Sequence, residues 1–244
     1  NSCARQWRRE PPGRSQGEQH RSAQHGGTSV SSGDPSVVLT TPDYWDEACR
    51  HLARKDRVMK RLIPQFGDAC LQSRGDAFTT LARSIVGQQI SVKAAQSVWE
   101  RFEKLPATMA PSHVLKLKVD DMRGAGLSAR KVEYLVDLAL HFDNGAVHVD
   151  QWTGMDDDSI IAELIAIRGI GRWTAEMFLI FALDRLDIFS LGDVGLRNGL
   201  NRLHGDGTKL DDEAALAITA GWAPYRSVGS WYLWRIADNT ALGS

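Results

Sequence analysis

The sequence predicts an all-α protein whose helices form two lobes with a cleft between them. Apolar residues recur at spacings of three and four along most of the chain, strand-like alternation is absent, and short glycine- and proline-containing connections separate the segments. The 244 residues are 43% hydrophobic and 24% charged, which suits one or two soluble domains. The longest apolar run, at 177–183, is far shorter than the ~20 residues of a membrane span.

Residues 1–36 are predicted to be a disordered leader and residues 37–244 the folded core. The leader is rich in Gly, Ser, Gln, His and Arg and has almost no aliphatic side chain. Its two glutamates and the absence of an apolar stripe argue against a targeting presequence, while a cloning or upstream-translation artefact remains an alternative to a biological tail. The core carries 24 basic against 27 acidic residues. Any contact with a polyanion must therefore use local basic groups and backbone amides.

About ten helical segments are predicted in the core. The first follows Thr41-Pro42-Asp43, a helix start signal, and places Trp45, Ala48 and Leu52 at helical spacing. The others are expected at about 76–85, 91–102, 111–117, 120–125, 129–142, 157–167, 173–183, 192–203, 212–221 and 227–242. Turns at 169–171 and 205–207 separate the later segments.

The most informative segment is the helical hairpin joined by Gly169-Ile170-Gly171. Its two helices present apolar faces formed by Ile161, Leu164, Ile165 and Ile167, and by Ala175, Phe178, Leu179 and Ala182. The glycines allow positive φ and a close approach of the backbone to a ligand. The second helix begins directly, so its unpaired N–H groups and positive dipole end can hold a phosphate without a lysine. A simple helical hairpin turned by glycine is the alternative.

Several motifs in this order carry a resemblance to a known family. They are Ile85-Val86-Gly87-Gln88-Gln89-Ile90-Ser91, Gly126-Leu127-Ser128-Ala129-Arg130-Lys131, Ile167 to Ala175, Phe189 to Arg197, Trp222 to Ser227 and Trp231-Tyr232-Leu233-Trp234. The chain resembles the helix-hairpin-helix superfamily of DNA glycosylases, and within it the alkylation-repair branch of 3-methyladenine DNA glycosylase II. The resemblance implies this superfamily's two-lobed architecture, damaged double-stranded DNA as partner, and a role in base excision repair. Ser190 stands where many relatives have proline, so the loop before Asp193 is expected to be less rigid.

Asp193 is the candidate catalytic residue. It lies 22 residues after Gly171 at the start of a predicted helix, where the alternative role is a helix N-cap. Cleavage of an N-glycosidic bond builds positive charge on the sugar, which a carboxylate stabilises while it orients or deprotonates water. The resemblance places Trp173 and Trp234 at the pocket for a cationic methylated base, with Trp222 and Tyr232 as further candidates.

Other residues are predicted to contact DNA or a cation. The candidates for DNA contacts are Gly169, Ile170, Gly171, Arg172 and Thr174 of the hairpin, together with Gln89, Arg130 and Lys131. Gln89 is expected to fill the gap left by a flipped base, the alternative being an amide buried against loop backbone. Arg130 and Lys131 are expected at a flanking phosphate, the alternative being solvated surface charges. The resemblance suggests that carbonyls of Ile165, Ile167 and Ile170 hold a monovalent cation such as Na⁺ or K⁺.

The expected activity is that of a monofunctional DNA N-glycosylase acting on bases such as 3-methyladenine and 7-methylguanine. The resemblance puts Trp173 where strand-nicking members carry a Schiff-base lysine, and an indole has no amine. A bifunctional glycosylase/lyase and a non-catalytic DNA-binding module are the alternatives. No cofactor is expected to be required, and the absence of a C-terminal cysteine quartet argues against an iron–sulfur cluster. We expect a cytoplasmic monomer that associates with the nucleoid and with no membrane.

Overall fold

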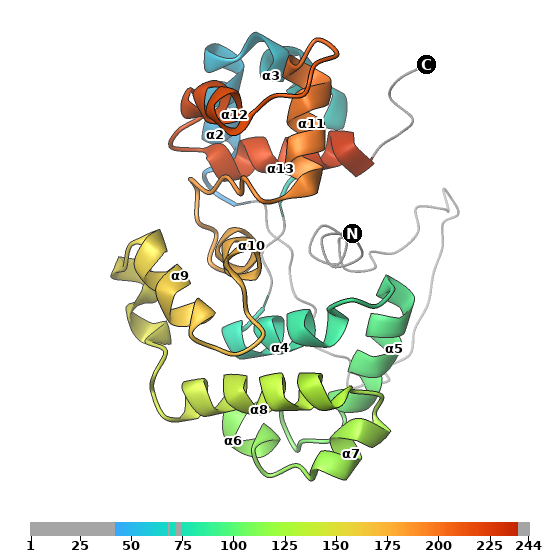
Figure 1. The fold of residues 1–244 in the computed structure, drawn as a ribbon. Coiled ribbons are helices and arrows are strands. Elements are labelled where there is room, and N and C mark those ends of the chain that lie inside the picture. The colour runs from blue at the N-terminus through green and yellow to red at the C-terminus, as the bar shows by residue number, and fades with distance from the viewer. Residues whose placement is uncertain (1–41, 68, 72–74, 239–244) are drawn as a thin grey trace, which may run out of the picture.

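The computed structural model describes residues 42–67, 69–71 and 75–238, and this part of the chain is helical with no strand (Figure 1). The all-α prediction is confirmed there. The predicted leader, residues 1–36, lies outside the described residues. None of the described helices combines the length and apolar character needed to cross a bilayer.

The helices form two groups on either side of α10 (Arg172–Ala182), as Figure 1 shows. The first group contains α2 (Trp45–Lys55), α3 (Arg57–Leu62), η1 (Ile63–Phe66), α11 (Val194–His204), α12 (Asp212–Ala220) and α13 (Arg226–Asp238). The second contains α4 (Ala77–Gly87), α5 (Val92–Phe102), α6 (Pro111–Val114), α7 (Val119–Gly124), α8 (Ala129–Asp143), η2 (Val149–Gly154) and α9 (Asp157–Ile165). Because α2 packs against α13, the described chain begins and ends in the first group.

Helix α3 was not predicted from the sequence. It has six residues, too few to display a helical period. Asp56 separates it from α2 by adopting an extended conformation with φ of −136°, and its side chain accepts the N–H groups of Val58 and Met59. The residue thus ends one helix and caps the next.

Most of the longer helices begin at a side-chain cap, and α10 does not. The caps are Asp56, Asp76, Ser91, Ser128, Asp156, Asp193 and Asp211, each of which accepts a backbone N–H of its own helix. Helix α10 begins at Gly171, which has no side chain to accept such a bond. The first N–H groups of α10 therefore have no side-chain acceptor at the cap position.

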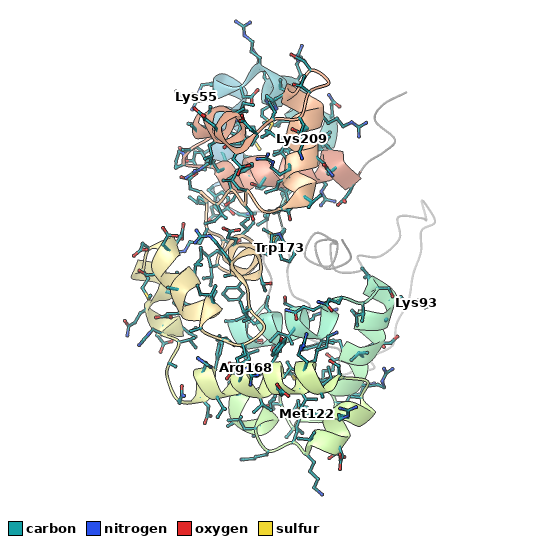
Figure 2. All side chains as sticks on the ribbon, in the orientation of Figure 1. Lys55, Lys93, Met122, Arg168, Trp173 and Lys209 are labelled. Atoms are coloured by element: carbon teal, nitrogen blue, oxygen red, sulfur yellow. The ribbon has the colours of Figure 1, made fainter. Side chains whose placement is uncertain are left out.

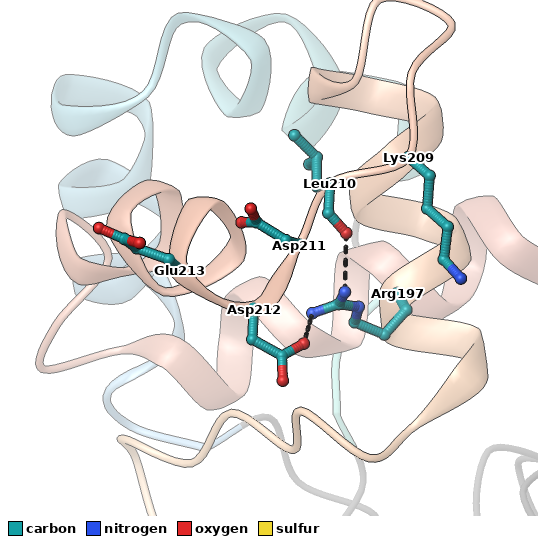
Figure 3. A pocket seen from close by; sticks show the side chains of 6 residues that line it. All are labelled: Arg197, Lys209, Leu210, Asp211, Asp212 and Glu213. Atoms are coloured by element: carbon teal, nitrogen blue, oxygen red, sulfur yellow. Dashed lines mark hydrogen bonds and ion pairs between the residues drawn. The ribbon is translucent and has the colours of Figure 1, made fainter.

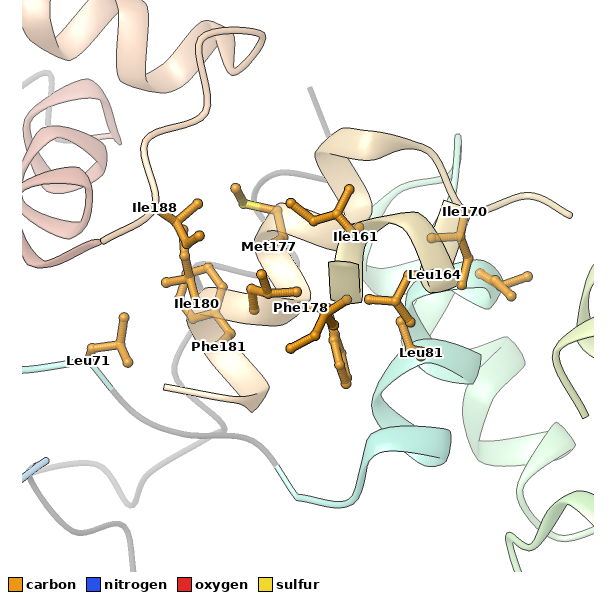
Figure 4. Close-up of a cluster of buried hydrophobic side chains, with 14 of the residues drawn as sticks. Leu71, Leu81, Ile161, Leu164, Ile170, Met177, Phe178, Ile180, Phe181 and Ile188 are labelled. Carbon is orange, nitrogen blue, oxygen red and sulfur yellow. The ribbon is translucent and has the colours of Figure 1, made fainter. Parts of the chain in front are cut away.

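Apolar packing surrounds α10 and fixes its position. Its buried residues are Thr174, Ala175, Met177, Phe178, Leu179, Ile180 and Phe181, and Figure 4 shows their larger side chains among those of Leu81, Leu164 and Ile188. Full burial of each large apolar side chain contributes roughly 1.5–3 kcal/mol. Elsewhere in the core, Trp45 and Trp231 are buried and meet edge to face with ring centroids 5.2 Å apart.

Candidate active site

Asp193 is a buried carboxylate, 2% exposed, with three hydrogen-bond donors around it. Its Oδ1 accepts the Leu196 N–H at 2.8 Å and the Trp234 indole N–H at 3.0 Å. Its Oδ2 accepts the Trp173 indole N–H at 2.7 Å. An ionised carboxylate has only acceptor sites, so these three donors stabilise it despite its low exposure. The N-cap role and the predicted place beside two tryptophans are therefore both realised.

The two tryptophans reach Asp193 from different helices. Trp173 is the second residue of α10, next to the hairpin, and is only partly buried (Figure 2). Trp234 lies on α13, is 2% exposed, and stacks on Phe181 with ring centroids 5.5 Å apart. Trp173 can thus offer surface to a base. Trp234 is at the predicted place, but burial and Phe181 cover it, so it holds the carboxylate and does not form an open pocket wall.

Trp222 and Tyr232 are buried and bond to residues other than Asp193, so neither side chain offers an exposed face to a base. Trp222 is fully buried and its indole N–H donates to Asp56 Oδ2 at 2.9 Å. Tyr232 is 1% exposed, and its hydroxyl lies 3.3 Å from the Cys49 sulfur. Burial is the main reason that the pKa of this hydroxyl is raised. Residues two apart on a helix point in different directions, so Tyr232 and Trp234 cannot face the same site.

The two hairpin glycines have different surroundings. Gly169 has φ of +88°, and a Cβ atom there would lie 2.2 Å from the Tyr134 ring. A Cβ atom on Gly171, at φ of −95°, would meet nothing within 4 Å. The fold therefore requires the first glycine, while the space beside the second is open to a ligand.

Two predicted DNA contacts of the hairpin can act only through their backbone. Ile170 is 4% exposed and Thr174 is 7% exposed, so both side chains are buried in the protein. Their side chains therefore pack inside the protein, and only their backbone groups can contact DNA. Thr174 is the third residue of α10, and its N–H is among the first four of that helix, which lack a partner within the helix.

The arginines of the hairpin are paired with carboxylates. Arg172 contacts Glu176 at 3.0 Å and Asp158 at 3.2 Å, and the hydrogen bond to Asp158 is the main cause of its raised pKa. Arg168 contacts Glu133 at 3.2 Å, and both side chains are more than half exposed. The pairs of Arg172 with Asp158 and of Arg168 with Glu133 are exposed and contribute about 0–1 kcal/mol, so a DNA phosphate can replace either carboxylate with little loss of free energy.

The loop after α4 places two neighbouring glutamines in different roles. The Gln88 amide donates to the Gly169 carbonyl at 2.8 Å, which ties this loop to the hairpin. Gln89 is exposed and has φ of +59°, a conformation uncommon for residues other than glycine. The alternative for Gln89 was a side-chain amide that hydrogen-bonds to loop backbone. Gln88 makes that hydrogen bond instead, and the exposed Gln89 side chain projects outward.

The two basic residues that open α8 also differ. The Lys131 ammonium donates to the Val86 carbonyl at 2.7 Å, near the end of α4. This bond supports the fold, and the ammonium keeps further donors, so its contact with a phosphate stays a prediction. Arg130 is exposed and available for the predicted contact.

The predicted cation ligands lie at the bend of the hairpin. The Ile167 carbonyl accepts the Ile170 N–H at 3.1 Å and keeps a second lone pair. Ile165 is the last residue of α9. Neutral carbonyl donors of this kind suit a monovalent ion, and no cluster of three or more His, Cys, Asp or Glu side chains within the described residues could hold a metal.

The hydrogen bond between Ser190 and Glu176 could not be predicted from the sequence. The Ser190 hydroxyl donates to Glu176 Oε2 at 2.5 Å, and the Ser190 carbonyl accepts the Asp193 N–H at 3.1 Å. The expected loss of rigidity at Ser190 is thus offset by a hydrogen bond to α10. The two side chains are 14 residues apart, and no local pattern links them.

Arg197, one helical turn after Asp193 on α11, lines a surface hollow together with residues 209–213, as Figure 3 shows. Arg197 donates to Asp212 Oδ1 and to the Leu210 carbonyl, both at 2.7 Å. None of the residues predicted for the site lines this hollow.

Known proteins share this sequence pattern and this fold. Residues 82–224 match the family described as HhH-GPD superfamily base excision DNA repair protein. DNA-3-methyladenine glycosylase 1 of Schizosaccharomyces pombe is 30% identical over 200 residues, which cover 78% of this chain and 88% of that protein. The crystal structure of a DNA-3-methyladenine glycosidase from Bacillus halodurans superposes with a TM-score of 0.73 at 34% identity and covers 82% and 91% of the two chains. The S. pombe 3-methyladenine DNA glycosylase in complex with abasic DNA gives a TM-score of 0.65 at 30% identity over 78% and 95% of the chains.

Proposed function

Because this chain belongs to the HhH-GPD superfamily of base excision DNA repair proteins, we propose that it is a DNA glycosylase that releases alkylated bases such as 3-methyladenine and 7-methylguanine. The observation that carries this proposal is the Asp193 carboxylate, bonded at 2.7 Å to an indole that lies two residues after Gly171. A phosphate held at the hairpin would bring a nucleotide close to this carboxylate. A DNA-binding module without catalysis would need Asp193 only as the cap of α11, whereas base release also needs the carboxylate beside the hairpin.

The carboxylate can lower the barrier to base release in two ways. As the bond between C1′ and the base nitrogen breaks, its electron pair leaves with the base and positive charge develops on the sugar. The Asp193 anion stabilises that charge, and low solvent exposure strengthens the attraction. A water molecule then bonds to C1′ and gives up its proton, for which Asp193 Oδ2 has an unused lone pair. The methylated base leaves as a neutral molecule, so no acid is needed to protonate it.

Access to the bond requires that the base leave the double helix. Extrusion requires a few kcal/mol, and a side chain in the vacated space reduces that requirement. The outward-projecting Gln89 is suited to this role. The partly exposed Trp173 can hold the cationic base, an attraction of about 0.5–2 kcal/mol. We include damaged duplex DNA as substrate and a monomeric enzyme in the proposal.

The direct test is incubation of the protein with methylated duplex DNA, followed by chromatography of the released material. Free 3-methyladenine or 7-methylguanine is expected, with abasic sites left in the strand. DNA binding without any released base would favour the non-catalytic module instead. Release from single-stranded DNA alone would contradict the proposal of a duplex substrate.

We further propose that the enzyme does not cut the strand by Schiff-base chemistry. Trp173 supplies no amine at the site, since an indole nitrogen cannot form the imine that such cleavage needs. Borohydride added during turnover should leave the protein without bound DNA, as judged by gel electrophoresis. A covalent protein–DNA adduct would show that a lysine reaches the sugar.

A monovalent cation at the hairpin bend also belongs to the proposal. The carbonyls of Ile165, Ile167 and Ile170 would hold it, and it would add positive charge beside the DNA phosphate. At constant ionic strength, DNA affinity should fall when K⁺ and Na⁺ are replaced by a bulky organic cation. Unchanged affinity would remove the ion from the proposal.

A further inference from the structure

Glu176 joins two parts of the site that act on different parts of the substrate. Its Oε1 accepts the Arg172 guanidinium N–H at 3.0 Å, at the end of α10 proposed to hold the DNA strand. Its Oε2 accepts the Ser190 hydroxyl at 2.5 Å, in the loop that precedes Asp193. One carboxylate therefore contacts both the strand-binding end of α10 and the loop of the catalytic candidate.

The bond to Ser190 is shielded from water. Ser190 is fully buried, and the Glu176 side chain is 12% exposed. A hydrogen bond to an ionised carboxylate is roughly twice as strong as one between neutral groups. The Ser190 carbonyl also accepts the Asp193 N–H at 3.1 Å, so the position of Ser190 sets where the backbone of Asp193 lies.

Two parallel ties thus run from the first turns of α10 to the same loop. The first joins the Trp173 indole to the Asp193 carboxylate and the second joins Glu176 to Ser190. On α10 the donor Trp173 and the acceptor Glu176 are three residues apart, so they occupy neighbouring positions on one helix face. Two contacts fix both the place and the direction of the loop, which one contact cannot do.

We propose that Glu176 and Ser190 are positioning residues, which keep Asp193 in register with the helix that holds the DNA strand. The inference rests on the proposed function, because it assumes that Asp193 acts on the sugar. Neither side chain touches the reacting atoms. Their removal should slow base release and leave DNA affinity unchanged, since a misplaced reacting group lowers the rate without weakening the grip on the strand.

The test compares Ser190→Ala, Glu176→Ala and Glu176→Gln. The first two variants remove the tie. In Glu176→Gln the amide oxygen can still accept from Arg172, and the amide N–H can donate to the Ser190 oxygen, so the tie is kept while the charge is lost. Asp158→Asn is the matched control: Asp158 is the other acidic partner of Arg172 and has no bond to the loop.

Single-turnover base release and DNA affinity are measured for each variant well below its melting temperature. Ser190→Ala and Glu176→Ala should be slower by about 10- to 100-fold, the range for small misplacements of a reacting group, with dissociation constants near that of the wild type. Glu176→Gln and Asp158→Asn should retain most of the rate. The double variant of Ser190→Ala and Glu176→Ala should be no slower than either single variant.

A second readout separates failure of this inference from failure of the proposed function. Hydrogen exchange of peptides covering residues 187–196 should be faster in Ser190→Ala and Glu176→Ala than in Asp158→Asn, whether or not bases are released. If the wild-type protein releases no base but these two variants still exchange faster, the contact between Glu176 and Ser190 is confirmed and the proposed function is overturned. Unchanged exchange and unchanged rates in Ser190→Ala would overturn the positioning role, as would an equal rate loss in Asp158→Asn.

Discussion

At the scale of single residues, the cap and the catalytic candidate are one side chain. Asp193 Oδ1 accepts the Leu196 N–H at 2.8 Å as a helix cap does, and Oδ2 accepts the Trp173 N–H at 2.7 Å. Capping fixes the carboxylate relative to α11, and the indole fixes it relative to α10. A residue held from both sides is preorganised for a charge that develops nearby.

Asp193→Asn should greatly slow base release while DNA binding is largely kept. Asparagine is also a good helix cap, so α11 should remain in place. Its neutral amide cannot stabilise the sugar cation, and its NH₂ group faces an indole donor, which should lower stability by about 1–2 kcal/mol. Single-turnover release should fall by at least about 100-fold, the loss typical of a removed electrostatic group. A fully active variant would contradict the catalytic role of Asp193.

Asp56 should make stability depend on pH in acid. Burial would raise its pKa, but hydrogen bonds from His204 and Trp222 outweigh burial and lower the pKa to about 2, below the ordinary 3.8. A depressed carboxyl pKa adds stability above about pH 4, and that contribution is lost as pH falls from about 4 towards 2. We therefore expect Asp56→Asn to lower the free energy of unfolding at pH 7 by about 1–2 kcal/mol, with the shift discounted for partial solvent screening.

The measurement is urea denaturation of both proteins at pH 7, 4 and 3. The difference between wild type and Asp56→Asn should be widest at pH 7 and should narrow below pH 4. A difference that stays constant across this range would mean that the Asp56 carboxylate is not preferentially stabilised in the folded protein.

At the scale of elements, the hairpin contains one glycine that the fold requires and a second glycine beside which the space is open. Gly169 has positive φ and packs under the Tyr134 ring, whereas Gly171 starts α10 with open space beside it. Gln88 bonds to the Gly169 carbonyl, so α4 also supports the bend. The loop is therefore held from behind, and its free side remains for the strand.

Gly171→Ala should weaken DNA binding without loss of fold stability. A methyl group at this position meets no protein atom within 4 Å, yet it would stand where a phosphate approaches the first N–H groups of α10. We expect DNA affinity to fall by about tenfold, equivalent to one lost hydrogen bond to a charged group. Gly154→Ala is a control, because its Cβ also meets nothing and it lies on η2. Equal DNA affinities of Gly171→Ala and Gly154→Ala would show that the hairpin is a structural turn and does not bind the phosphate.

Gly169→Ala should instead lower the stability of the protein. The alanine would be strained at φ of +88° and its Cβ would overlap the Tyr134 ring at 2.2 Å. Strained backbone alone contributes about 1–3 kcal/mol, so the melting temperature should drop clearly. A melting temperature equal to that of the wild type would show that the bend does not need glycine there.

At the scale of the whole molecule, DNA binding cannot depend on a general positive field. The chain has a net charge of −1, and the hairpin arginines are paired with Asp158, Glu176 and Glu133. The number of phosphates neutralised should therefore be small, about two or three. The slope of log K against log salt should then lie near −2 to −3, by the relation of about −0.9 per phosphate. A slope of about −6 or steeper would indicate an extended basic surface.

The sequence by itself determined the helical class, nearly all helix positions, the glycine bend and the helix-capping position of Asp193. These signals are local, because apolar spacing, caps and turn glycines act over a few residues. Only the tertiary structure decided which tryptophans meet Asp193, that Gln88 and not Gln89 bonds to the hairpin, and that Ser190 bonds to Glu176. Each of these contacts joins residues 14 to 81 positions apart, and the rotation of one packed helix against another sets them. That rotation depends on the whole core, which no short stretch of sequence encodes.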